Sequence, residues 1–323
     1  MCESLYTLRD RLFCLFFAIF MVGCAQAGKE SAPTQRVVEA TRPQITAENF
    51  PRLDGSTSAE PILAQIVCEF FQASCEWYDW IDGERRLVPV AQSMEMQLPT
   101  LNVSGTHEAY LSLIAGESDL ILVARVPSTD ERALAQNSLV ALDIQPIALD
   151  AFVFIIHENN LVEGLSSEQI RKIYTGEITN WNQVGGQDIP IHAYQREPNS
   201  GSRELMDQLV MNDLPAKEAP DLMLPTMFAP FYAVSSDIAG IGYSIFFYEE
   251  NMAPLEEHVK LLAVDGLMPQ ASSIQNQAYP YTTEVYAVTR GDQPKDSLAY
   301  RLRAWLRSPH GQELIEKSGY VKR

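Results

Sequence analysis

The chain has 323 residues, of which 46% are hydrophobic and 20% are charged, and its formal net charge is −18. This composition is typical of a folded protein with one large core or two smaller ones. The acidic balance argues against nucleic-acid binding, which needs a basic surface. It also provides no long-range attraction for an anionic ligand, so local hydrogen bonds would have to hold one.

The N-terminal segment predicts export. Two arginines, Arg9 and Arg11, precede an apolar run over residues 12–22, which is shorter than the ~20 residues that a membrane span needs. A single glycine separates this run from Cys24, as in bacterial lipoprotein signals. We therefore expect a signal peptide over residues 1–23 and a lipid on Cys24. Ordinary secretion with an unmodified Cys24 is the alternative.

Residues 24–46 are rich in Ala, Glu, Thr, Lys and Pro and show no apolar periodicity. Such a composition predicts a flexible tether between a membrane and a folded body. Together with the lipid on Cys24, it predicts a protein anchored to the cell membrane that faces the periplasm or the cell exterior.

Two cysteines, Cys68 and Cys75, lie beyond the signal region. In an exported chain, such a pair favours one disulfide. The alternative is that Cys68 lies on the buried face of a helix as a small apolar residue. No Cys or His cluster has the spacing of metal ligands, and no H-E-x-x-H pattern occurs. We therefore expect neither a metal nor a cofactor.

From Phe50 onward, short apolar strand-like runs alternate with helical stretches. This alternation predicts an α/β architecture with largely parallel sheets, and its length favours two lobes. The predicted elements, in chain order, are helix 60–72, helix 108–115, strand 120–124, strand 152–156, helix 167–174, strand 189–194, helix 203–210, strand 241–245, strand 284–289 and helix 295–306.

Three of the predicted helices begin at clusters of Ser, Thr and Gly, over residues 54–58, 104–106 and 200–202. A helix N-terminus presents free backbone N–H groups and partial positive charge, so it accepts anions. In an α/β sheet, such starts lie at the carboxyl ends of strands, where ligands bind. Three converging starts would surround a tetrahedral oxyanion, and Arg196 would add a charge-assisted contact. Each cluster by itself is more often only a helix cap, and an isolated Arg196 is more often solvated.

The order of these motifs resembles the phosphate-binding receptors of bacterial phosphate ABC transporters, a family of two-lobed solute-binding proteins. The most specific segment is residues 165–181, LSSEQIRKIYTGEITNW, because helix, Gly turn and Asn-Trp occur in family order. The resemblance extends over nearly all of residues 50–321. Its matching segments are 54–58, 104–106, 165–181, 184–186, 196–203, 240–243 and 279–280.

The resemblance implies a periplasmic-binding-protein-like α/β fold of two lobes. Each lobe would be a mostly parallel sheet flanked by helices, and two crossing strands would join them. Lobe 1 would comprise residues 47–145 and 281–323, lobe 2 residues 146–280, with the ligand in the cleft between them. Carried over by motif, the anion contacts are Ser56, Thr57 and Ser58, then Ser104 or Thr106, and then Arg196, Ser200, Gly201 and Ser202.

One position departs from the family pattern. The family often has a Ser-Asp pair after the strand that here ends at Ala124, and this Asp accepts the proton of hydrogen phosphate; this chain has Arg125 there. A carboxylate repels a fully ionised anion such as sulfate, whereas an arginine discriminates in neither direction. We expect Arg125 to be an oxyanion ligand; the alternative is a salt-bridged residue at the cleft edge. Glu197 would replace the missing acceptor or would be a solvated loop acid.

The expected function is binding of phosphate in the cleft and its delivery to the permease subunits of an ABC transporter, by a monomer. The alternatives are binding of another tetrahedral oxyanion, or a surface sensor or adhesion protein that retains the fold. We expect no enzyme activity, because the sequence has no G-x-S-x-G elbow, no nucleophile with an evident His partner and no metal motif.

Overall fold

The structure, a computed structural model, describes residues 41–80, 84–212, 214–253 and 258–323. The predicted signal peptide, Cys24 and the tether as far as residue 40 lie outside the described residues. Residues 41–46 were expected to belong to the tether, but they pack on the folded body. Ile45 is buried in the main core, and Arg42 donates to the carbonyl of Glu69 at 2.6 Å and lies over the Phe70 ring. Burial of Ile45 stabilises this attachment.

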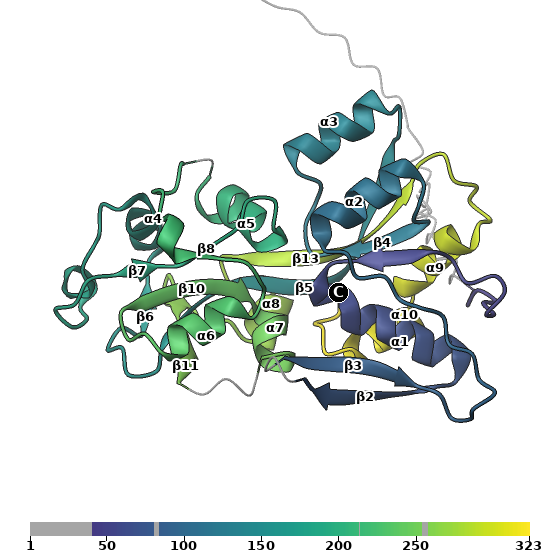
Figure 1. Ribbon diagram of the computed structural model, residues 1–323, viewed down its shortest axis with the longest axis horizontal. Helices are drawn as coiled ribbons and strands as arrows, with labels where there is room; N and C mark the ends of the chain where they lie inside the picture. Colours follow the sequence, from purple (N-terminus) through teal and green to yellow (C-terminus); the bar gives the residue numbers. More distant parts are fainter. Residues whose placement is uncertain (1–40, 81–83, 213, 254–257) are drawn as a thin grey trace, which may run out of the picture. The chain divides into compact units, whose positions relative to one another are not determined.

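A seven-stranded sheet in the described residues has the order β1-β4-β13-β5-β10-β7, with β11 also paired to β5 (Figure 1). The strands are β1 (Leu53–Gly55), β4 (Leu120–Val123), β5 (Leu142–His157), β7 (His192–Ala193), β10 (Gly240–Ile245), β11 (Val259–Leu261) and β13 (Thr282–Arg290). Shorter pairs join β2 (Ser74–Asp79) to β3 (Arg85–Val90), β6 (Gly164–Leu165) to β12 (Ala263–Val264), and β8 (Gln195–Arg196) to β9 (Met223–Leu224).

The sheet is mixed, and the expectation of mostly parallel sheets is wrong in this respect. β1 pairs with β4 and β10 pairs with β7 in parallel. β13 is antiparallel to both β4 and β5, and β10 and β11 are antiparallel to β5. The reason is the path of the chain, which passes from one half of the sheet to the other on β5 and returns on β13. Two neighbouring strands that cross in this way must run in opposite directions.

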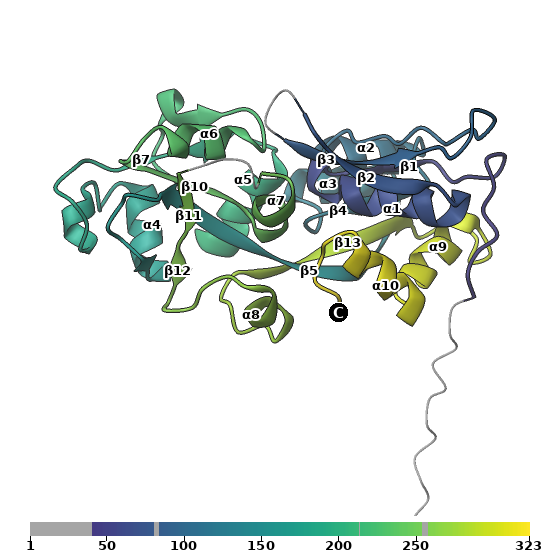
Figure 2. The same ribbon diagram turned by 90° about the horizontal axis from the view of Figure 1, so that it is seen from below.

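β5 joins the two halves of the sheet, as Figure 2 shows. It pairs with β13 from Leu142 to Ala151 and with β10 from Phe152 to Ile156. The register with β13 shifts once, next to the pairing of Tyr286 with Pro146. Proline has no N–H to donate to a ladder, so an irregularity is expected there. The proposed lobe boundaries at 145/146 and 280/281 stay a prediction.

Helices gather around each half of the sheet (Figures 1 and 2). Beside β1, β4 and β13 lie α1 (Glu60–Phe71), α2 (Thr106–Ala115), α3 (Thr129–Asn137), α9 (Leu298–Leu306) and α10 (Pro309–Lys317). Beside β5, β7 and β10 lie α4 (Ser167–Thr175), α5 (Gly201–Leu205), α6 (Ala229–Ser235), α7 (Phe246–Asn251) and α8 (Ala271–Gln275). Shorter helical turns are 3-10 at Thr57–Ala59, Trp181–Val184 and Pro220–Leu222, and π-helical at Met206–Val210.

Every element predicted from the sequence is present, with shifted ends. The predicted helix 203–210 is α5 followed by the π-helical turn, and the predicted helix 295–306 begins at Leu298. None of the helices in the described residues is both long enough and apolar enough to cross a membrane.

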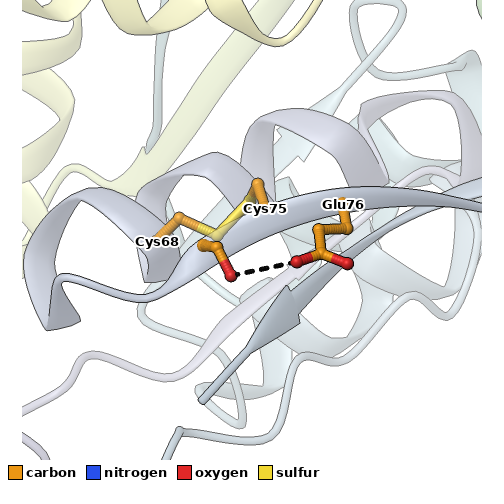
Figure 3. Close-up of a disulfide and its surroundings, with 4 residues drawn as sticks. Cys68, Cys75 and Glu76 are labelled. Carbon is orange, nitrogen blue, oxygen red and sulfur yellow. Dashed lines mark hydrogen bonds between the residues drawn. A yellow bond between two sulfur atoms is a disulfide. The ribbon is translucent and has the colours of Figure 1, made fainter. Parts of the chain in front are cut away.

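A disulfide links Cys68 in α1 to Cys75 in β2, with 5.9 Å between their Cα atoms. Figure 3 shows this bond beside Glu76, which accepts a hydrogen bond from Ser74 Oγ at 3.3 Å. The bond attaches the β2–β3 hairpin to α1, on which the hairpin packs. A cross-link of this kind restricts the unfolded chain and thereby stabilises the folded one.

Candidate functional site

A cavity of about 330 Å³ lies where the three predicted helix starts meet. Of the oxyanion contacts expected from the sequence, those that line it are Ser56, Thr57, Ser58, Ser104, Thr106, Arg196, Ser200, Gly201 and Ser202. The loop after β1 and the start of α2 form one wall, and β8 with the start of α5 forms the other. The tertiary structure therefore brings together three clusters that are widely separated in the sequence.

The first wall begins where β1 ends. A Cβ on Gly55 would lie 2.5 Å from the carbonyl oxygen of Leu122, so only glycine allows this approach to β4. Ser56 then caps the helical turn: its Oγ accepts from the Ala59 N–H at 3.3 Å and lies 3.1 Å from Ser58 Oγ. The first N–H groups of such a turn have no partner within the helix, so they are available to a ligand.

Asp54 holds this loop and the start of α2 together. Its carboxylate is fully buried and accepts from Gly55 N at 2.7 Å, Asn102 Nδ2 at 2.9 Å, Ser104 N at 3.0 Å and Ser104 Oγ at 2.8 Å. Both donors of Ser104 therefore point to Asp54 and not to a ligand. Thr106 also lines the cavity, and its Oγ1 has no hydrogen-bond partner within the described part of the chain. Of the two residues expected to contact the anion, Ser104 or Thr106, Thr106 is therefore the better candidate.

The other wall approaches the first closely. Ser200 Oγ accepts from the Arg203 N–H at 3.2 Å and caps α5. A Cβ on Gly201 would lie 2.7 Å from Thr106 Oγ1, so glycine is needed where the starts of α2 and α5 meet. A small ligand between these helix starts would therefore receive backbone N–H groups from both halves of the sheet.

Arg196 is the cation of the cavity. The residue is only 5% exposed. Its guanidinium donates to the carbonyls of Leu224 and Pro225, both at 3.1 Å, to Ser202 Oγ at 3.4 Å and to Met227 Sδ at 3.1 Å. Among the described residues, no carboxylate forms a salt bridge with it. Burial lowers the pKa of Arg196, but an arginine stays protonated in proteins. A buried cation without a counter-ion favours an anion beside it.

Arg125 does not line the cavity, and the expectation that it is an oxyanion ligand finds no support in its position. It is 1% exposed, and its Nη1 and Nη2 donate to Oε2 and Oε1 of Glu131 at 2.7 and 2.8 Å. Ser128 caps α3, and its N–H donates to Glu131 Oε2 at 2.7 Å, which fixes the carboxylate beside Arg125. Ala124, one residue earlier, lines the cavity instead. The alternative, a salt-bridged arginine, describes this position.

Burial by itself would raise the pKa of Glu131. The hydrogen bonds and charge of Arg125, with the Ser128 N–H and His107, outweigh burial and hold the pKa below its usual value. The ion pair therefore stays ionised at neutral pH.

The cavity also contains residues that the sequence analysis does not select. His107 and Glu108 follow Thr106 directly, and Met227 contacts Arg196 from 31 residues away. The role of Glu131 at the start of α3 could have been predicted from the sequence, because Ser128 and Glu131 have the spacing of a capping box. Met227 had no such sequence signal, since only the fold brings it to Arg196.

Glu197, the suggested replacement acceptor, lines the cavity. No group of three or more His, Cys, Asp or Glu residues in the described ranges could hold a metal ion.

Comparisons with known proteins agree with this architecture. The phosphate-binding protein PstS of Borreliella burgdorferi is 26% identical over 280 residues, which cover 85% of this chain and 90% of that protein. The phosphate-binding protein PstS of Bacillus subtilis is 20% identical over 308 residues, covering 95% and 92%.

Two solved structures share the fold. One is a putative phosphate ABC transporter substrate-binding protein with bound phosphate from Clostridium perfringens, with a TM-score of 0.63, 23% identity and coverage of 84% of this chain and 98% of that one. The other is an ABC-type phosphate transport receptor from Vibrio cholerae, with a TM-score of 0.62, 23% identity and coverage of 85% and 100%. The sequence model of the PBP superfamily domain matches residues 88–309. The chain therefore belongs to the PBP superfamily.

Proposed function

We propose that this protein is an extracytoplasmic solute-binding protein that binds phosphate in the cavity and delivers it to the permease of an ABC transporter. It acts as a monomer without catalysing a reaction and is held at the membrane by a lipid on Cys24. The names of its relatives, phosphate-binding proteins and phosphate transport receptors, support this assignment.

The observation that carries the proposal is Arg196, a buried cation in the cavity wall with no salt-bridge partner among the described residues. Charge-assisted hydrogen bonds from arginine suit the oxygens of a tetrahedral anion. The starts of α2 and α5 add N–H groups. Thr57 and Thr106 add hydroxyls from one wall of the cavity, and Ser202 adds one from the other. These donors attract an anion locally, although the net charge of the chain is −18.

A ligand in this cavity would connect the two halves of the sheet. Thr57 and Thr106 belong to the half with β1 and β4, whereas Arg196 and Gly201 belong to the half with β10. Contacts from both halves would favour their close approach, with β5 and β13 as the connecting strands. A ligand that binds only the folded, closed protein must also raise its thermal stability by mass action.

A ligand screen tests the proposal. The compact unit from Glu39 to Arg323 would be heated with phosphate, sulfate, arsenate or molybdate, and its unfolding temperature would be recorded. We expect phosphate to raise the unfolding temperature and Arg196→Ala to remove most of this shift. No shift with millimolar phosphate would refute phosphate binding.

A second candidate is binding of another tetrahedral oxyanion. It is favoured by Arg125, which occupies the position of the acid expected from the family resemblance and is paired with Glu131. A larger stabilisation by sulfate or molybdate than by phosphate would establish this alternative. Delivery to a permease is tested separately, by comparing phosphate uptake in cells with and without this gene; a sensor or adhesion protein would leave uptake unchanged.

A further inference from the structure

His107 is a residue of the cavity wall whose ring is oriented by a contact with Glu131. It is the second residue of α2, directly after Thr106, and its side chain is 27% exposed. One ring nitrogen, Nδ1, lies 2.9 Å from Glu131 Oε1. Within the described residues, the other ring nitrogen, Nε2, has no hydrogen-bond partner.

The partner of Nδ1 determines where the ring carries its hydrogen. Arg125 and the Ser128 N–H hold Glu131 ionised, and an ionised carboxylate only accepts hydrogen bonds. Nδ1 must therefore carry a hydrogen. It follows that Nε2 of the neutral ring is an acceptor, and that Nε2 of the protonated ring is a donor with a positive charge.

Charged groups surround this ring on several elements. Glu131 lies on α3 and contacts the ring, and Arg125, beyond Glu131, follows β4. Arg196 and Glu197 come from the opposite wall of the cavity, and Glu108 follows His107 on α2 itself. Because Arg125 neutralises Glu131, protonation of His107 adds a cation to a wall in which Arg196 is the permanent one.

We propose that His107 is a specificity-determining residue that matches the protonation state of the bound oxyanion. This inference rests on the proposed oxyanion function. When neutral, Nε2 accepts the O–H of a protonated anion such as hydrogen phosphate, and its lone pair repels a fully ionised one. When protonated, Nε2 donates, so the cavity also admits sulfate. The preference for phosphate over sulfate is therefore stronger when the ring is neutral than when it is protonated.

Calorimetric titration with phosphate and with sulfate, at several pH values between about 5.5 and 8, tests this proposal. Sulfate carries no proton in this range, so a change in its affinity belongs to the protein. We expect sulfate affinity in the unsubstituted protein to rise roughly tenfold as the pH falls, because one charge-assisted contact is added. In His107→Gln the rise should be less than about twofold, since the amide does not titrate.

Two further variants complete the experiment. His107→Asn retains an amide donor near the position of Nδ1 and lacks Nε2, so it should match His107→Gln and replaces that variant if it misfolds. His192→Gln is the matched control, because His192 is also bound through Nδ1 to a carboxylate, that of Asp237 at 2.8 Å, but lies outside the cavity wall. It should retain the pH dependence. Asp150 and Glu249, whose pKa values burial raises to about 7, are unchanged in every variant.

The outcomes separate the two proposals. If phosphate binds but the sulfate profile of His107→Gln equals that of the unsubstituted protein, the role of His107 is wrong and phosphate binding stands. Absence of sulfate binding at every pH, or the same loss of pH dependence in His192→Gln, also overturns the role of His107. If neither anion binds the unsubstituted protein, the proposed function fails, and this inference fails with it.

Discussion

Two buried arginines, Arg125 and Arg196, have opposite surroundings. Arg125 follows β4 and forms a two-bond ion pair with Glu131, away from the cavity. Arg196 lies on β8, donates to carbonyls, a hydroxyl and a thioether, and has no salt bridge among the described residues. One buried charge is neutralised by the protein itself, whereas the other has no counter-ion among the described residues. Burial of an arginine therefore does not by itself select a candidate binding residue, and the absence of a counter-ion is the feature on which the proposal for Arg196 rests.

Arg125→Met should have the largest effect on stability. It leaves the buried carboxylate of Glu131 without its cation, which costs about 3–5 kcal/mol. Urea unfolding would measure this loss. Phosphate affinity should fall much less than in Arg196→Ala, because Arg125 is not in the cavity wall and reaches it only through Glu131 and His107. If Arg125→Met lost phosphate affinity but kept its free energy of unfolding, the contrast between Arg125 and Arg196 would be wrong.

Arg196→Ala should show the reverse pattern. We expect phosphate affinity to fall at least about tenfold, because a charge-assisted contact of ~1.5–3 kcal/mol is removed. The ligand-free protein should lose less stability than Arg125→Met does, since no charge is left unpaired. Calorimetry would measure the affinity. Arg203→Ala is the control, because Arg203 pairs with Asp207 on the same helical segment and does not line the cavity. Equal losses in both variants would remove Arg196 from the site.

Asp150 extends the comparison to a buried carboxyl without a cation. It is buried in β5 and accepts from the N–H groups of Ala151 at 2.8 Å and Phe247 at 3.0 Å, while its Oδ2 has no hydrogen-bond partner in the described part of the chain. Burial raises its pKa to about 7, against the opposing hydrogen bonds from Phe247 and Ala151. The folded protein therefore holds a proton between about pH 4 and pH 7 that the unfolded chain has released.

The sign of the pH dependence follows. The stability that comes from protonated Asp150 is fully present below about pH 4. It is lost as the pH rises to about 7, by up to about 1.4 kcal/mol per pH unit. Urea unfolding across this range should show a weaker decline in Asp150→Asn than in the unsubstituted protein. If the free energy of unfolding changed with pH in the same way in both proteins, Asp150 would have the same pKa in the folded and unfolded states. Glu249, with its pKa also raised to about 7 by burial, contributes equally to both proteins.

Of the four substitutions, Asp54→Asn should have the smallest effect. Asp54 is a buried carboxylate that N–H and O–H donors satisfy without a cation. An amide retains one acceptor oxygen but turns an NH₂ group towards Asn102 or Ser104, so the start of α2 should loosen. We expect phosphate affinity to fall by about fivefold, or ~1 kcal/mol. Ser104→Ala, which removes one of the four bonds, should lose less; a larger loss would mean that Ser104 itself contacts the ligand.

The sequence predicted the elements and the clusters of the cavity, but not how each charged side chain is used. Ser56, Thr106 and Gly201 were found because caps and glycines leave local signals at helix starts. Arg125 was expected to contact the ligand but pairs with Glu131 outside the cavity lining, although Ser128 and Glu131 carry the spacing of a capping box. The mixed sheet was missed because apolar runs do not record the direction of the neighbouring strand. Residues 41–46 were assigned to the tether because one buried isoleucine leaves no periodic pattern.

The sequence by itself determined the family resemblance, the alternation of strands and helices, and three helix starts suited to an anion. These depend on short-range properties such as caps, turns and apolar spacing. Only the tertiary structure decided that Arg196 lacks a salt-bridge partner among the described residues, that Arg125 has one, and that Glu131 orients His107 in the cavity wall. The physical reason is that the energy of a buried charge depends on which groups surround it in space.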